Sequence, residues 1–385
     1  MDLLHKIFFD SGLMALSWQN VAMFIVSGVL MYLAIAKNYE PLLLLPIGFG
    51  ALMANIPNAM LASFDNWVPA GHDAVAPLMQ LVYNAGIKTE FLPPVIFLGV
   101  GALTDFRPLL SRPITFVLGG AAQFGVFIAA VGASYIFGFT PQEAGSIGII
   151  GGADGPTSIY LTAKMAPHLM GAIAVASYSY MSLVPVLQPP VLRLLTTKKE
   201  RAIQMKQAKP VSRTTVLLFP VICTLMVSLL IPTVAPLIGM LMFGNLIRES
   251  GVTERLSNTA STHLINTVTI FLALAVGSTM EGTNFLQSKT LFILVLGCIA
   301  FLFSTAGGIL FAKLLNLVLP ERMKINPCIG AAGVSAVPMS ARVVQKFVSE
   351  ETGGKVNPLM AAMGPNVAGV IGTAIAAGVF LALLK

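Results

Sequence analysis

Charged residues are scarce in this chain: only 10% of its 385 residues are Asp, Glu, Lys or Arg, whereas 56% are hydrophobic. Soluble globular domains carry about 25% charged residues, so the composition excludes a soluble globule. The chain also lacks ten-residue stretches in which apolar and polar positions alternate, the pattern of a membrane β-barrel. These two absences indicate an all-α polytopic membrane protein.

Motifs for covalent or metal-dependent catalysis are missing as well. The three cysteines, Cys223, Cys298 and Cys328, have no metal-ligand spacing. Nucleophile elbows, phosphate-binding loops and zincin motifs are absent. No aromatic residues interleave with the basic ones, so we expect no nucleic-acid partner. Any chemistry must therefore be simple, or be brought by a partner.

Long apolar runs, in contrast, fill most of the chain. About 20 residues cross a bilayer, and the sequence predicts ten or eleven candidate spans, some of them half-spans. Before the first span, residues 1–18 lack a small-residue cleavage site and do not resemble a cleaved signal peptide. We expect this segment to lie at the membrane interface.

The positive charge is concentrated in one loop. Seven lysines and arginines stand against a single glutamate between Arg193 and Arg213, in a chain whose net charge is +7. Because positively charged loops stay on the inner side, we predict that loop 197–213 is cytoplasmic and that the chain lies in the cell inner membrane. This loop separates a first membrane repeat, 19–196, from a second, 214–385.

Three pairs of matching segments support this division. Gly48–Asn55 resembles Gly239–Asn245, and Val100–Asp105 resembles Val276–Glu281. The third pair is a glycine-rich motif at 151–157 and its copy at 330–335, which align without gaps at an offset of 178 positions. The first half carries an insertion, 63–73. Duplicated halves with interrupted apolar segments are typical of transporters, so we expect two repeats, inverted in the membrane, whose broken helices meet at mid-membrane.

Asp154 is the only acid in this duplicated motif, because Ala332 occupies the matching position. A charged side chain at bilayer depth costs about 2.5–3.5 kcal/mol, so a cation or a proton is expected to compensate it. Helix breakers around Asp154 would free backbone carbonyls for an ion. Alternatively, the glycines serve only close helix packing.

Neutral oxygens accompany Asp154 in both copies of the motif. Thr157 matches Ser335, and Gln188 matches Asn366, both at the offset of 178. One carboxylate among neutral oxygens suits a monovalent cation, whereas Ca²⁺ usually recruits several carboxylates. The alternative is that these side chains only link helices, at about 0.6 kcal/mol each.

Two cations lie at matching positions beyond the motifs. We expect Arg342 to hold an anionic substrate, which arginine can bind through two hydrogen bonds, and its counterpart Lys164 to extend to the lipid headgroups. Tyr180 places a phenol in an apolar span, where it could relay a proton or complete an ion site. For Tyr178, a position in the interfacial aromatic belt is the competing interpretation. Asp105 and Arg107 are expected to form an ion pair.

Over essentially its whole length the chain resembles the membrane β subunits of sodium-pumping, biotin-dependent decarboxylases that act on oxaloacetate, methylmalonyl-CoA or glutaconyl-CoA. The motifs that carry this resemblance are residues 64–66, 99–106, 151–157, 178–181, 326–327, 333–342 and 363–369.

The resemblance implies that carboxybiotin, attached to a separate carrier, reaches this subunit from the cytoplasm and is decarboxylated there. Decarboxylation would consume a proton from the far side and drive Na⁺ export. The family's functional positions fall on Asp154, Tyr180, Asn326, Gly330, Ser335, Arg342 and Asn366.

Together with the residues discussed above, this implies three groups of site residues. Asp154, Tyr180, Ser335 and Arg342 are expected to be catalytic; Asn326, Gly330 and Arg342 to bind carboxybiotin; and Asp154, Thr157, Ser335 and Asn366 to bind Na⁺. The implied partners are a cytoplasmic carboxyltransferase subunit, the biotin carrier, a small membrane-anchored subunit and further copies of this chain. A secondary sodium/proton or sodium/organic anion transporter is the alternative that the duplicated broken helices suit equally well.

Overall fold

The computed structural model describes residues 11–59, 78–205 and 210–384, and these residues form helices and connecting segments without any strand. The all-α prediction is therefore confirmed. Residues 1–10 of the predicted interfacial segment, the insertion 63–73 with motif 64–66, and residues 206–209 of the basic loop lie outside the described residues.

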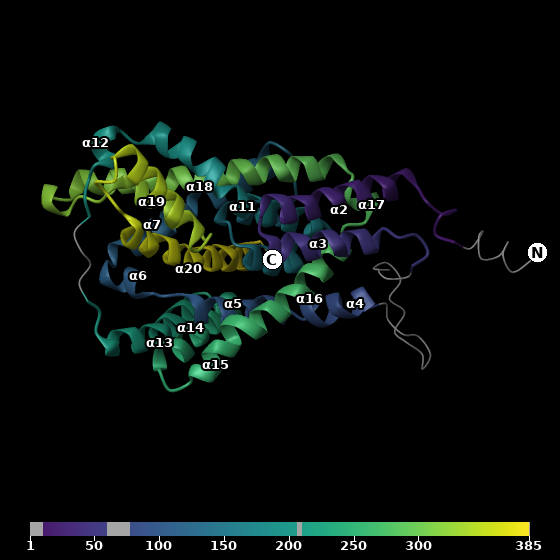
Figure 1. The fold of residues 1–385 in the computed structure, drawn as a ribbon, viewed down its shortest axis with the longest axis horizontal. Helices are drawn as coiled ribbons and strands as arrows, with labels where there is room; N and C mark the ends of the chain where they lie inside the picture. The colour runs from purple at the N-terminus through teal and green to yellow at the C-terminus, as the bar shows by residue number, and fades with distance from the viewer. Residues whose placement is uncertain (1–10, 60–77, 206–209, 385) are drawn as a thin grey trace, which may run out of the picture.

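Figure 1 shows the helices, and short 3-10 or π-helical segments carry the label η. Before the basic loop, the chain forms α2 (Trp18–Lys37), α3 (Pro41–Ala54), α4 (Leu78–Tyr83), η1 (Asn84–Lys88), α5 (Leu92–Leu103), α6 (Arg107–Ser111), α7 (Ile114–Ala122), α8 (Phe124–Tyr135), α9 (Pro141–Gly148), η2 (Ile149–Gly152), α10 (Gly155–Met165), η3 (Pro167–Leu169) and α11 (Met170–Leu195). From the loop onward, it forms α12 (Lys198–Arg201), α13 (Arg213–Leu230), η4 (Pro232–Val234), α14 (Ala235–Ser250), α15 (Glu254–Asn258), η5 (Thr259–Leu264), α16 (Ile265–Ser278), α17 (Gly282–Phe285), α18 (Ser288–Val318), η6 (Glu321–Met323), η7 (Pro327–Gly333), α19 (Met339–Glu351) and α20 (Leu359–Leu383).

Seven helical segments of the described chain are long and apolar enough to cross a membrane, and a bent pair, Leu78–Lys88 with Leu92–Leu103, raises the number to eight. The chain is therefore a multi-pass membrane protein. Ten or eleven spans were predicted, and the difference has a physical cause. The runs that contain the two motifs are broken at their glycines, and the apolar helix α3 has only 14 residues.

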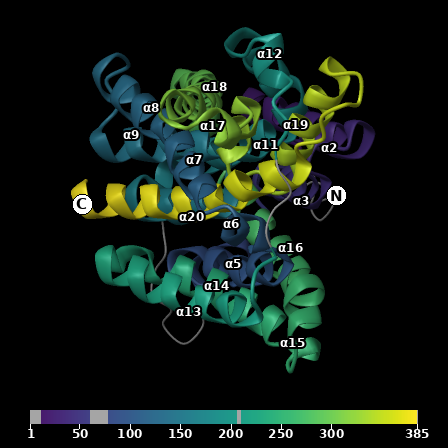
Figure 2. The ribbon, with the colours of Figure 1, turned by 90° about the vertical axis from the view of Figure 1, so that its left-hand side faces the viewer.

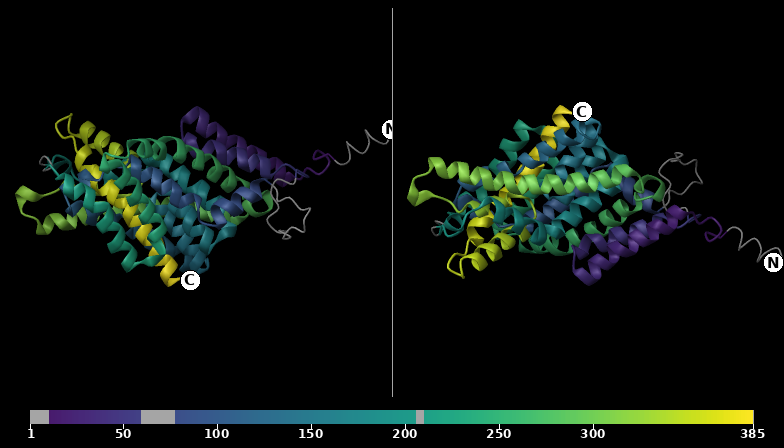
Figure 3. Two further views of the ribbon diagram at one scale, coloured as in Figure 1. Left: turned by 90° about the horizontal axis from the view of Figure 1, so that it is seen from below. Right: turned by 90° about the horizontal axis from the view of Figure 1, so that it is seen from above.

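The helices lie on two sides of α20. Figures 1 and 2 show α5, α13, α14, α15 and α16 on one side of α20, and α7, α11, α18 and α19 on the other. Figure 3 shows α18, the longest helix, running along the outside of the second group. The motif segments η2 and η7 both pack against α18 and α20, in the interior of the molecule.

Contacts between the two sequence halves are reciprocal. Helix α3 packs against α16, and its sequence counterpart α14 packs against α5, the counterpart of α16. At the end of α3, the Asn55 side-chain amide donates to the Met280 carbonyl (2.7 Å). Asn245 of α14 donates likewise to the carbonyl of Thr104, the counterpart of Met280 (2.9 Å). This exchange is what a two-fold relation between the halves predicts.

Candidate functional site

The two glycine-rich motifs meet in the structure. The Ser335 amide of the second motif donates to the Gly152 carbonyl of the first (2.8 Å). The Ser335 hydroxyl also donates to Oδ2 of Asp154 (3.2 Å). Asp154 is only 6% exposed, and Ser335 only 7%. Residues 181 positions apart therefore form one buried junction around a single carboxylate.

The local backbone holds Asp154 at the start of a helix. Ala153 has a left-handed conformation (φ 53°), which ends η2, and Asp154 then caps α10 in an extended conformation. Oδ1 of Asp154 accepts a hydrogen bond from the Thr157 amide (3.2 Å). The positive end of the helix dipole stabilises a carboxylate at this position, so part of the cost of burying the charge is offset locally.

Two side-chain amides fix the second motif from both halves of the sequence. Asn366 of α20 donates to the carbonyls of Ala332 (3.0 Å) and Val334 (2.8 Å). Gln188 of α11 donates to the Ala331 carbonyl (2.7 Å). Although Gln188 is the sequence counterpart of Asn366, it holds the same motif rather than the first one.

Several buried oxygens near this junction accept or donate no hydrogen bond within the described part of the chain. They are the hydroxyl of Tyr178 and the amide carbonyls of Asn366 and Gln188. A buried unpaired oxygen costs free energy, and a cation would satisfy such oxygens. The described residues contain no group of three or more His, Cys, Asp or Glu that could hold a metal ion, so the donor set is one carboxylate with neutral oxygens and fits a monovalent cation.

The glycines of the motifs also permit close packing. A Cβ on Gly330 would lie 2.1 Å from the Gly308 carbonyl oxygen of α18. A Cβ on Gly155 would lie 2.0 Å from the ring of Tyr178. Close packing therefore accounts for Gly155 and Gly330, and it places Gly330 against α18.

The two tyrosines of α11 occupy different environments. Tyr178 is fully buried against Gly155, beside Asp154, which excludes a place in an interfacial belt. The Tyr180 hydroxyl donates instead to the Leu294 carbonyl of α18. Tyr178, rather than Tyr180, contacts the first motif, and no feature of the sequence distinguishes the two.

The two matching cations also differ. Arg342 lies in the first turn of α19, is exposed, and makes no ion pair with any described residue. Lys164, expected at the headgroups, instead pairs with Glu90 (2.8 Å). Sequence reasoning missed Glu90 because it lies outside every repeated motif. The expected pair of Asp105 with Arg107 is confirmed (3.3 Å).

Asn326 caps the start of η7 and connects it to the basic loop. Its Oδ1 accepts from the Cys328 amide, and its NH₂ group donates to the carbonyls of Arg201 (2.9 Å) and Ile203 (3.1 Å). The structure therefore places Asn326 at the entrance of the second motif rather than at the Asp154 junction.

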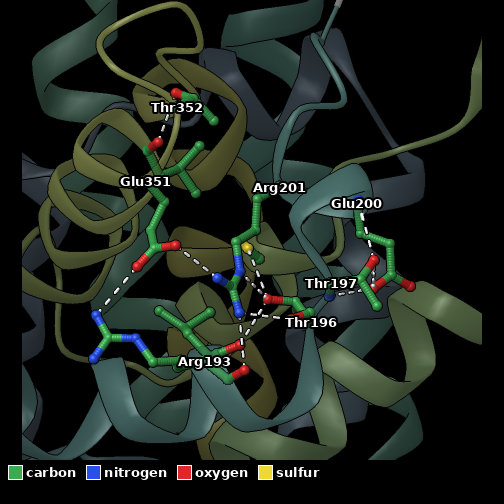
Figure 4. A network of polar contacts seen from close by, with 10 residues as sticks. Arg193, Thr196, Thr197, Glu200, Arg201, Glu351 and Thr352 are labelled. Carbon is green, nitrogen blue, oxygen red and sulfur yellow. Dashed lines mark hydrogen bonds and ion pairs between the residues drawn. The ribbon is translucent and has the colours of Figure 1, made fainter.

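Arg201 is the centre of the polar network in Figure 4. Its guanidinium is only 7% exposed and donates to Glu351 at the end of α19 (2.7 Å) and to the carbonyls of Arg193 (2.8 Å) and Thr196 (2.6 Å). Burial raises the pKa of the Glu351 carboxyl. Hydrogen bonds from Arg193 and Arg201 lower it by more than burial raises it, so this pKa lies below its usual value. One short helix, α12, thus anchors both the beginning of the second motif and the end of α19.

Comparisons with known proteins all point to one family over nearly the whole chain. The family profile described as "Na+-transporting oxaloacetate decarboxylase beta subunit" matches residues 19–384. The chain is 56% identical to a methylmalonyl-CoA decarboxylase subunit beta of Veillonella parvula, covering 98% of this chain and 96% of the relative. It is 54% identical to a glutaconyl-CoA decarboxylase subunit beta of Acidaminococcus fermentans (97% and 96%) and 51% identical to an oxaloacetate decarboxylase beta chain of Klebsiella pneumoniae (99% and 99%).

Proposed function

This chain belongs to the family of Na⁺-transporting oxaloacetate decarboxylase beta subunits, and from this premise we propose that it is the carboxybiotin-decarboxylating membrane subunit of a primary sodium pump. A partner carrier delivers carboxybiotin, a proton is taken up, and the reaction is coupled to Na⁺ export. The observation that carries the proposal is the junction of the two motifs around Asp154.

The proposed Na⁺ ligands are Asp154, Thr157, Ser335 and Asn366. Asp154 and Ser335 are already in contact (3.2 Å), the Thr157 amide donates to Asp154 (3.2 Å), and the Asn366 carbonyl has no partner among the described residues. Since Ser335 belongs to the second motif and Asp154 to the first, a displacement of one half against the other separates two ligands. This arrangement supports alternating access between two sides.

The proposed carboxybiotin site lies around Arg342, with Asn326 and Gly330. When bound, carboxybiotin supplies an anionic carboxylate that is released as CO₂ once it is desolvated and its ureido group is protonated. The exposed guanidinium of Arg342 would orient that anion through two hydrogen bonds. Tyr180 is the proposed proton relay, and it would have to exchange its bond to the Leu294 carbonyl for this role.

The partners follow from the same proposal. They are a cytoplasmic carboxyltransferase subunit, a biotin carrier, a small membrane-anchored subunit and further copies of this chain, in the cell inner membrane. Relatives at 56%, 54% and 51% identity are named for three different substrates, so we assign the choice of acid to a partner polypeptide. The basic loop 197–213 is proposed to face the cytoplasm, and 19–196 and 214–385 to be the two membrane repeats.

The secondary-transporter alternative predicts no biotin. If the purified complex contains a biotinylated protein on an avidin blot, and avidin inhibits its Na⁺ uptake in inverted vesicles, the pump is supported. Na⁺ uptake that needs only an ion gradient and ignores avidin would instead favour the secondary transporter.

Replacement of Asp154 tests the site directly. Interactions with a charged group are worth about 1.5–3 kcal/mol, so we expect D154N to raise the Na⁺ concentration for half-maximal decarboxylation at least about tenfold. The assay is CO₂ release by the complex in reconstituted vesicles at increasing Na⁺. D105N is the matched control, since Asp105 is an acid of the same half outside the junction. Full Na⁺-dependent activity in D154N would show that the assignment of Asp154 is wrong.

A further inference from the structure

Helix α10 connects the Asp154 junction to a second charged group. Asp154 caps the first turn of α10, and Lys164 lies in its last turn. The Lys164 ammonium is 2.8 Å from a carboxylate oxygen of Glu90 and 3.0 Å from the Tyr160 hydroxyl. The same ammonium lies 4.5 Å from the centre of the Tyr160 ring. A carboxylate, a phenol oxygen and an aromatic face together form a site for a monovalent cation.

The position of Glu90 is unusual. It connects η1 to α5, the two arms of a span bent by 64°. Its φ is 64°, in the left-handed region that residues other than glycine rarely adopt. Strained residues of this kind cluster at binding sites and switch regions. The bend directs the Glu90 carboxylate to the end of α10 instead of continuing a regular helix.

The Glu90 and Lys164 pair borders a cavity of about 400 Å³, which is also lined by Gln142, Thr233 and Leu384. Thr233 belongs to the turn between α13 and α14, and α13 begins directly after the basic loop. Since α13 is long enough to cross a membrane, this cavity lies on the side of the molecule away from that loop. The Lys164 side chain is 28% exposed and the Glu90 side chain is 35% exposed, so the cavity reaches both side chains.

The repeat allows Lys164 to be compared with its counterpart in the second half. Lys164 and Arg342 occupy matching positions, each beyond its glycine-rich motif. Arg342 is exposed and makes no ion pair with a described residue, whereas Lys164 is held by Glu90 and Tyr160. The second motif is therefore followed by a cation without an ion pair among the described residues, and the first motif is followed by a cation that is bound. We treat these two cations as the two ends of the Na⁺ path through the motifs.

We propose that Glu90 and Tyr160 form an outer cation site on the Na⁺ exit route, and that Lys164 is the tethered cation that fills and closes this site. The proposal rests on the proposed sodium pump. When α10 moves away from α5, Lys164 leaves Glu90, and an outgoing Na⁺ binds there before its release. Return of Lys164 displaces Na⁺ and closes the path.

The test uses the reconstituted complex and measures ²²Na⁺ transported per CO₂ released. We expect E90Q and K164Q to keep decarboxylation but to lower this ratio at least about fivefold, because an open outer site lets Na⁺ return. The charge-swapped variant E90K/K164E should restore the ratio to within about twofold of the wild type. The control K289Q removes a different ion pair, with Glu143, and should leave the ratio unchanged. Unchanged ratios in both E90Q and K164Q would overturn the proposal.

A second measurement needs no turnover, so it separates a failure of this proposal from a failure of the proposed pump. Ala163 lines the same cavity. We expect A163C to react with a membrane-impermeant maleimide at least about threefold faster in the E90Q and K164Q backgrounds than in the otherwise wild-type chain. The chain without the added cysteine gives the background labelling. Equal labelling rates in all three backgrounds would show that the pair does not close the cavity.

Discussion

At the scale of single residues, two side-chain amides near the junction donate hydrogen bonds through their NH₂ groups but accept none through their carbonyl oxygens within the described residues. The NH₂ groups of Asn366 and Gln188 are spent on backbone carbonyls of the second motif, and their own carbonyl oxygens have no partner in the described part of the chain. An amide whose NH₂ group is fixed presents its oxygen in a defined direction. The hydrogen bonds that Asn366 donates therefore position the carbonyl oxygen that we propose as a Na⁺ ligand.

Tyr178, which packs against Gly155 of the first motif, gives a prediction at this scale. Its hydroxyl is fully buried without a partner among the described residues, which costs about 1–3 kcal/mol. We expect Y178F to raise the apparent Tm in Na⁺-free detergent solution and to weaken the further rise that added Na⁺ produces. The second effect follows because a ligand that binds the native state less tightly stabilises it less.

Ser27 provides the control, because it is another buried hydroxyl without a partner in the described chain and lies in α2, away from the motifs. S27A should raise the Tm without changing the Na⁺ dependence. A lower Na⁺-free Tm in Y178F, or an unchanged response to Na⁺, would contradict a role for this hydroxyl at the ion site.

At the scale of elements, the four-residue helix α12 connects two distant parts of the fold. Arg201 connects it to the end of α19 through Glu351, and Asn326 connects it to the start of η7. We expect R201A to lower the free energy of unfolding by about 3 kcal/mol, because it leaves buried carbonyls and the Glu351 carboxylate without their main donor. R193A should cost less than about 1 kcal/mol, since its side chain is 68% exposed. Thermal unfolding of the solubilised protein measures both.

The same network has a defined pH dependence. Because the folded-state pKa of Glu351 is lowered, its ionised form stabilises the fold above its usual pKa, and this contribution is lost as the pH falls through the lowered value. The Tm difference between wild type and E351Q should therefore be largest near neutral pH and shrink in acid. If the Tm difference between wild type and E351Q instead grew in acid, the ionised Glu351 carboxylate would not stabilise the fold, and the proposed network would be wrong.

The elements also show what the sequence could predict. That the two motifs meet could be predicted from their shared offset and from the single acid, because both features can be read directly from the sequence. The role of Arg201 did not follow, since in a basic loop every lysine and arginine counts equally toward topology. Glu90 was missed because its left-handed backbone is a single-residue property without periodicity. The crossing of Gln188 to the second motif depends on where backbone carbonyls lie, which only tertiary packing decides.

At the scale of the whole molecule, the reciprocal contacts of Asn55 and Asn245 indicate a two-fold relation, and this relation predicts the topology. The turn after α2, at Asn38, corresponds to the turn after α13, at Pro232. If the halves are inverted, these turns lie on opposite sides of the membrane. Because α13 starts at the basic loop and crosses, we expect Pro232 on the outer side and Asn38 on the side of that loop.

Cysteine labelling from either side checks this topology. N38C and K199C should react with a membrane-impermeant maleimide in inverted vesicles, and P232C should react in right-side-out cells. All three positions are exposed, so lack of access from one side reports the membrane and not burial. Cys223 and Cys328 are buried and Cys298 is partly buried, so the unmodified chain sets the background. If N38C and P232C label from the same side, the halves are not inverted, and the pairing of Lys164 with Arg342 as two ends of one path loses its basis.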